Sequence, residues 1–125
     1  MLRINDAQRA VLDQVQFADF EERALQFLEE MLPEAFIFSG RDRMRQTVRV
    51  GQQRGLLLDF TTEREMIKYL YLRQLLGADV DTNPAFPWLR ALLNDQALEP
   101  EERLDRALRA VSAYLDTEDQ PRRAG

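Results

Sequence analysis

The sequence contains no cysteine and no histidine among its 125 residues. Without cysteine the chain can form no disulfide, and it has no thiol for nucleophilic catalysis or metal binding. Without histidine it lacks the side chain that most often serves as a general base and as a ligand for transition metals. The motifs of phosphate-binding loops, dinucleotide folds, serine hydrolases and zinc proteases do not occur either. We therefore expect a protein that is not an enzyme and that has no catalytic residue, cofactor or metal.

The sequence also lacks long apolar runs and an excess of basic residues. No stretch approaches the ~20 apolar residues of a membrane span, and no basic segment followed by an apolar one opens the chain as a secretory signal would. We therefore expect a cytoplasmic protein that binds no membrane. The 22 acidic and 17 basic residues give a formal net charge of −5, which disfavours binding to nucleic acid. This charge would suit a basic protein partner, although solubility is the commoner reason for it.

Glycine and proline are scarce, with five of each. Over most of the chain apolar residues recur at intervals of three and four, which is typical of amphipathic helices. We predict an all-α protein: a single-domain bundle of five to six helices over residues 1–116, followed by a flexible polar tail at residues 117–125. The segment Phe36-Ile37-Phe38 could form a strand, but nothing else in the chain offers it a partner. We interpret it as a connector packed on the core.

The expected helices follow from the apolar spacing and from the positions of Pro and Gly. No Gly or Pro separates residues 7–16 from residues 17–32, so these two helices could be one helix with a bend. Pro33 ends this first helical region, because the residue before a proline is disfavoured in helical conformation. The remaining helices are expected at residues 41–57 and 63–76, from Pro84 or Pro87 to residue 93, and from Pro100 onward.

The centre of the expected bundle is the helix at residues 63–76. Thr62 and Glu65 have the spacing of a capping box, in which each side chain accepts a backbone N–H of the other residue. The residues that follow are apolar around nearly the full circumference of the helix, which predicts a central position. Gly77 ends the helix, because glycine has no Cβ that would clash at positive φ. Trp88 is expected to be buried at the start of the next helix.

The loop after the central helix contains Asp79, Asp81 and Asn83 in the D-x-D-x-N spacing that begins an EF-hand calcium loop. The pattern then fails, because Pro84 stands where the loop needs glycine and Arg90 stands where it needs a bidentate glutamate. We therefore favour hydrogen bonds within turns and near a helix N-terminus for the three polar side chains.

Gly51 and Gly55 lie four residues apart in the helix expected at residues 41–57. Each glycine costs about 1 kcal/mol relative to alanine in a helix interior. A seam of small residues that admits a neighbouring helix would offset this cost. We favour such a seam over the alternative, a ligand that approaches the backbone.

Two groups of residues are candidates for partner binding: Arg41, Arg45 and Arg49 in one helix, and Tyr69, Tyr71, Leu72 and Arg73 in the central helix. The three arginines recur every four residues and therefore share one side of their helix. They could dock an acidic partner, although a solvated face paired with acidic residues of the preceding helix is favoured. The second group would form a protein-contact patch where the bundle leaves it uncovered, although core packing is favoured for most of it.

The segment RGLLLDFTTEREMIKYLYLRQLLGADVDTNPAFPWLRALLND, followed by ERLDRAL, resembles a family of small helical proteins of unknown function. These proteins are encoded beside the VgrG spike, PAAR tip and effector genes of bacterial type VI secretion systems. The resemblance rests on Phe20 and the Leu32-Pro33 stop, on Gly55-Leu56 with residues 62–66, and on the G-x-D-h-D-x-x-P-x-h-P-W pattern of residues 77–88. The chain departs from the family in the LLLDF stretch before residue 62 and at Ala78.

The resemblance implies a bacterial cytoplasmic protein from an effector cluster. Its implied role is that of an adaptor or chaperone, which holds an effector or a VgrG or PAAR-type spike component before secretion. A competing hypothesis is an immunity protein whose acidic surface blocks the active site of a cognate toxin. The family supplies no catalytic residue, and a homo-oligomer is compatible with either role.

Overall fold

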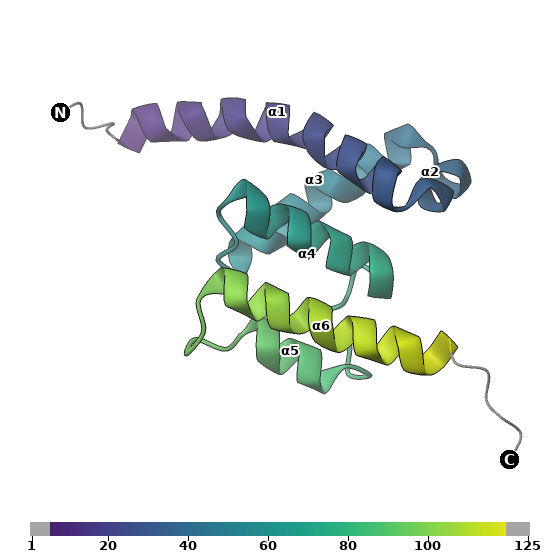
Figure 1. Cartoon of the computed structure of the whole chain (residues 1–125). Helices are drawn as coiled ribbons and strands as arrows, with labels where there is room; N and C mark the ends of the chain where they lie inside the picture. The colour runs from purple at the N-terminus through teal and green to yellow at the C-terminus, as the bar shows by residue number, and fades with distance from the viewer. Residues whose placement is uncertain (1–5, 120–125) are drawn as a thin grey trace, which may run out of the picture. The chain divides into compact units, whose positions relative to one another are not determined.

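The structure is a computed structural model that describes the backbone of residues 6–119 and the side chains of residues 19–117. Over the described backbone every element of regular secondary structure is a helix (Figure 1). Its helices are α1 (Asp6–Met31), α2 (Pro33–Ser39), α3 (Arg41–Leu57), α4 (Glu63–Leu76), α5 (Pro87–Leu93) and α6 (Pro100–Asp119). The prediction of an all-α protein is confirmed. Of the helices described, none combines the length and apolar character needed to cross a bilayer.

The chain divides into two compact units, residues 1–50 and residues 51–125, and the boundary falls inside α3. In the first unit, α1 is one continuous helix, so the two helices expected at residues 7–32 are joined. It ends at Met31 because Pro33 disfavours helical backbone at Leu32, where φ is −137° and ψ is 62°. Among the described side chains of this unit, those that are buried are apolar and come from α1 and α3: Phe20, Ala24, Leu25, Leu28, Met44 and Val48.

The interpretation of Phe36-Ile37-Phe38 as a connector packed on the core is wrong. Pro33 is the first residue of α2, where the fixed φ of proline suits a helix start. The helical turn that follows directs Ile37 and Phe38 away from the core, and these residues are 84% and 90% exposed. Phe36 is half-buried, and none of the residues of α2 is fully buried.

The second unit is built around α4, as predicted. The capping box is present: the Glu65 N–H donates to Thr62 Oγ1 at 3.1 Å, and the Thr62 N–H donates to Glu65 Oε1 at 3.3 Å. Gly77 follows the helix with a φ of +119°. Every residue at positions 65–76 is buried or half-buried. These observations confirm the central helix at residues 63–76.

The seam at Gly51 and Gly55 is where the second half of α3 meets α4. A Cβ added at Gly51 would overlap the Leu70 side chain, and one at Gly55 would lie 2.7 Å from Met66 Sδ and 3.1 Å from Tyr69 Cδ2. Alanine would therefore force α3 and α4 apart or displace the α4 side chains. The seam admits a neighbouring helix rather than a ligand.

α6 packs against both α4 and α5 within the second unit (Figure 1). Its buried stripe is Leu104, Ala107 and Val111. Lys68 of α4 lies 3.0 Å from a Glu101 oxygen and 2.5 Å from an Asp105 oxygen of α6. The helix continues to residue 119, so the first three residues of the expected tail are helical, and residues 120–125 lie outside the described part of the chain.

Trp88 is half-buried rather than buried. Its ring centroid lies 6.0 Å from that of Phe86 and 6.2 Å from that of Tyr114, and the Phe86 and Tyr114 centroids are 5.5 Å apart. The indole therefore packs in a cluster of three aromatic rings at the surface of the second unit, where Tyr114 remains partly exposed. α5 begins at Pro87, one of the two predicted starts.

Candidate functional site

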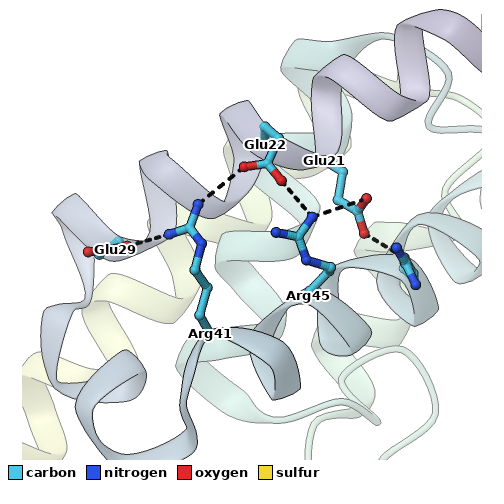
Figure 2. Close-up of polar contacts among 6 residues, drawn as sticks. Glu21, Glu22, Glu29, Arg41 and Arg45 are labelled. Atoms are coloured by element: carbon cyan, nitrogen blue, oxygen red, sulfur yellow. Dashed lines mark hydrogen bonds and ion pairs between the residues drawn. The ribbon is translucent and has the colours of Figure 1, made fainter.

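The three arginines predicted to bind a partner form an ionic ladder between α3 and α1 in the first unit (Figure 2). We define this ladder as Arg41, Arg45 and Arg49 of α3 with Glu21, Glu22 and Glu29 of α1. Arg41 lies 2.8 Å from a Glu29 oxygen and 3.2 Å from a Glu22 oxygen, and Arg45 lies 2.5 Å from the other Glu22 oxygen. Arg41 thus bridges two carboxylates of α1.

The other end of the ladder is built in the same way. Arg45 Nη1 lies 3.6 Å from one oxygen of Glu21, and Arg49 Nε lies 2.6 Å from the other. The hydrogen bond from Arg45 holds the pKa of Glu22 below its ordinary value of 4.5, and the same contact raises the pKa of Arg45. All three arginines therefore have carboxylate partners within their own chain. This agrees with the favoured alternative, in which the arginines form a solvated face paired with acidic residues of the preceding helix.

Of the second predicted group, Tyr69, Leu72 and Arg73 are buried and Tyr71 is half-buried. Tyr69 and Leu72 are fully inaccessible to solvent, because α4 is covered around most of its circumference. Tyr69, Leu72 and Arg73 thus lie in the interior of the second unit, in agreement with the favoured alternative of core packing for most of the group.

A buried polar network, which we did not predict, joins α3, α4 and the loop at residues 77–86. The Asp81 carboxylate, 2% exposed, accepts from Arg54 Nε at 2.5 Å and from the Tyr69 hydroxyl at 3.3 Å. Arg73 Nη1 donates to the Tyr69 hydroxyl at 3.2 Å, and its guanidinium carbon lies 5.6 Å from the Tyr69 ring centroid. Burial raises the pKa of Tyr69. We refer to Arg54, Tyr69, Arg73 and Asp81 as the buried network; the Arg54 side chain is 41% exposed, and the other three residues are buried.

The buried network explains the D-x-D-x-N loop without calcium. Asp81 faces the interior, the backbone oxygen of Asp79 accepts from the N–H groups of Thr82 and Asn83, and Asn83 Oδ1 accepts from the Ala85 N–H. Within the described part of the chain no three acidic side chains are grouped so that they could hold a metal ion. The predicted turn hydrogen bond of a polar side chain is therefore present at Asn83, whereas Asp79 contributes its backbone oxygen and Asp81 has a different role.

The most exposed apolar side chains of the described structure lie on α2. Glu34, Ile37 and Phe38 are separated by three and four residues, so they share one face of the helix, and all three are exposed. We call this face the α2 surface. Large apolar side chains that are exposed together usually mark a protein contact.

An acidic pocket lies beside the start of α2. It is open, has a volume of about 550 Å³, and is lined by three carboxylates, one amide, one guanidinium and one proline ring: Glu22, Glu29, Glu30, Gln26, Arg41 and Pro33. Pro33 belongs both to the pocket and to α2, so the pocket adjoins the α2 surface in the chain. The α2 surface and the acidic pocket together form the candidate site.

The chain matches no protein-family model, no curated protein and no solved structure. The candidate site therefore rests on the chemistry of the chain alone. Sequence analysis missed it because three large apolar residues between Pro33 and Gly40 are too few to show which side of a short helix is buried. The one indication of this exposed face in the sequence is the spacing of its residues, because Ile37 lies three residues after Glu34 and next to Phe38.

Proposed function

We propose that this protein is a non-catalytic protein-binding module that acts as an adaptor or chaperone. The observation that carries the proposal is the exposure of Ile37 and Phe38 on the α2 surface. Burial of a large apolar side chain stabilises a protein by about 1.5–3 kcal/mol, and the folded chain forgoes this at two adjacent positions. A partner that covers both side chains would recover it.

The ion pairs and hydrogen bonds that the charged side chains form with one another support the proposal of a non-catalytic role. The carboxylates of the ionic ladder bind arginines, and Asp81 is held by Arg54 and Tyr69. A carboxylate that acts as a general acid or base near neutral pH usually has a raised pKa and faces a cleft. The pKa of Glu22, which does line the acidic pocket, is instead lowered.

The biological setting of the proposal comes from the resemblance described above. In that setting the partner is a type VI secretion effector or a VgrG or PAAR-type spike component, and the protein acts in the bacterial cytoplasm. The acidic pocket favours a second candidate function, that of an immunity protein, because a surface with excess carboxylates can block a basic active site of a toxin.

Co-purification with each protein encoded beside this one would test the proposal. We expect one partner to be retained by the unmodified chain and lost by the double variant Ile37→Ser, Phe38→Ser. The matched control is Leu57→Ser, which removes an apolar side chain that is 75% exposed in the second unit. Retention by the double variant would show that the α2 surface is not the binding site, and failure to retain any neighbour would overturn the proposal.

A toxicity assay separates the two roles. An adaptor leaves the bound effector toxic in a cell that expresses both proteins, whereas an immunity protein allows that cell to survive. The double variant on the α2 surface should abolish the effect in whichever assay is positive. Survival that is unchanged by the double variant would place an immunity function elsewhere on the chain.

A further inference from the structure

The geometry points to a cationic amphipathic segment as the part of the partner that binds here, with apolar side chains on the α2 surface and lysine or arginine beside them. This inference rests on the proposed function, because it names the chemistry of the partner at the same site. The α2 surface and the acidic pocket both lie within residues 1–50, so the inference depends on one compact unit only.

The first argument is the position of Glu34. Its carboxylate lies one helical turn before Ile37 and Phe38 on the same exposed face. Among the described residues Glu34 has no ion-pair partner. A partner residue that approaches the apolar pair from this side would meet an uncompensated negative charge.

The second argument is the balance of charge in the acidic pocket. Among the described residues of the lining Arg41 is the only basic one, and it is shared between Glu22 and Glu29. The third carboxylate, Glu30, accepts only a long hydrogen bond of 3.4 Å from the Gln26 amide within the described part of the chain. Glu30 and Glu34 therefore flank the start of α2 with two charges that a cation from outside could neutralise.

This charge distribution argues against the other occupants of an apolar surface. An anionic lipid surface would be repelled by the same carboxylates that attract a basic segment. A second copy of the chain related by a twofold axis would bring the acidic pockets towards one another, and like charges across an interface disfavour association. An acidic partner would have to displace the glutamates that already hold Arg41, Arg45 and Arg49.

The test uses the full chain and two synthetic amphipathic peptides that share the same leucine and phenylalanine face. One peptide carries arginine at the positions bordering that face, and the other carries glutamate there. We expect the arginine peptide to bind, as measured by fluorescence anisotropy at low salt, and to bind more weakly as salt is added. The glutamate peptide should not bind.

Variants of the protein locate the contact. The double variant Ile37→Ser, Phe38→Ser should weaken binding of the arginine peptide roughly tenfold or more, because it removes the apolar anchors. The double variant Glu30→Gln, Glu34→Gln should weaken it about two- to fivefold and flatten its salt dependence, which is the range for exposed ion pairs. Glu99→Gln is the matched control, since it removes an exposed carboxylate of the second unit.

The outcomes distinguish this inference from the proposed function. Equal binding of both peptides, or no binding of the arginine peptide, overturns the inference that the partner binds through a cationic segment. With either of these results, the proposed function still stands if the double variant Ile37→Ser, Phe38→Ser fails to retain the natural partner in the co-purification assay. Sedimentation that shows a dimer sensitive to the same variant would assign the surface to a second copy. Binding to phosphatidylglycerol vesicles that the variant abolishes would assign it to a membrane, and either result overturns the inference.

Discussion

The two halves of α3 carry arginines whose carboxylate partners differ in exposure: the Glu22 side chain is 54% exposed and that of Asp81 only 2%, whereas Arg54 itself is 41% exposed. In the first unit Arg41, Arg45 and Arg49 bind glutamates at the surface, and in the second unit Arg54 binds the inaccessible carboxylate of Asp81. The distances are similar in the two places. What differs is the solvent, since water can replace a lost partner in the ladder but cannot easily reach the Asp81 carboxylate.

The comparison teaches that contact geometry alone does not rank the importance of an ion pair. The ionic ladder has more pairs, but those of Glu22 and Glu29 are exposed to water and salt, and all of them fix flexible side chains. The buried network has few members, and removal of one leaves others without hydrogen-bond partners. We therefore expect the buried network to dominate the stability of the second unit and the ladder to contribute little to that of the first.

Removal of the Asp81 carboxylate should have the largest effect. Asp81→Ala leaves Arg54 and the Tyr69 hydroxyl without their acceptor and frees the loop at residues 77–86 from α3 and α4. We expect a loss of about 2–4 kcal/mol in the free energy of unfolding, as for hydrogen bonds between charged and buried groups. Urea unfolding followed by circular dichroism would measure it. The control is Glu29→Ala in the ladder, and an equal loss in both variants would refute the comparison.

The seam that holds the buried network together is the next place to test. Gly55→Ala introduces a Cβ that meets Met66 Sδ at 2.7 Å and Tyr69 Cδ2 at 3.1 Å. Overpacking should outweigh the gain in helix propensity and lower stability by about 1–2 kcal/mol. The matched control is Gln53→Ala, an exposed position of the same helix, which should be neutral or stabilising. A Gly55→Ala variant as stable as this control would show that the seam is not tight.

The seam and the centre of the second unit could be predicted because their signals are local. The capping box needs only Thr62 and Glu65, and the end of α4 needs only Gly77. The pair of glycines was informative for a different reason. Their cost in a helix requires a compensating contact, so Gly51 and Gly55 indicated a close neighbour even though the sequence did not identify α4 as that neighbour.

The candidate site and the buried network could not be predicted because they depend on contacts between distant residues. Asp81 is 27 residues from Arg54 and 12 from Tyr69, and no spacing rule links such positions. Ile37 and Phe38 were expected in the core because apolar residues usually are buried. Their exposure depends on which side of α2 faces α1, and seven residues are too few to show this in the sequence.

The Tyr69 hydroxyl tests how much the buried network depends on its central bridge. Tyr69→Phe removes the group that donates to Asp81 and accepts from Arg73 but keeps the ring. We expect a loss of about 1 kcal/mol at neutral pH. Because burial raises the pKa of Tyr69 above its ordinary value of 10.0, its contribution is present below that value and is lost as the pH rises through the folded-state pKa. Urea unfolding from pH 8 upward should therefore show a steeper alkaline loss in the unmodified chain than in Tyr69→Phe, and parallel curves would contradict this.

The smallest effect should come from the ionic ladder. The Arg45 hydrogen bond lowers the pKa of Glu22, so its contribution is present above the ordinary pKa of 4.5 and is lost as the pH falls through the lower, folded-state pKa. Arg45→Gln should raise the pKa of Glu22 towards 4.5, as measured by carboxyl carbon NMR during an acid titration. The urea midpoint at neutral pH should change less than for any variant above, and high salt should remove the difference, because the pair is exposed and screened. A salt-independent loss as large as that of Asp81→Ala would mean that the ladder is shielded from water in solution and that exposure does not separate the two halves of α3.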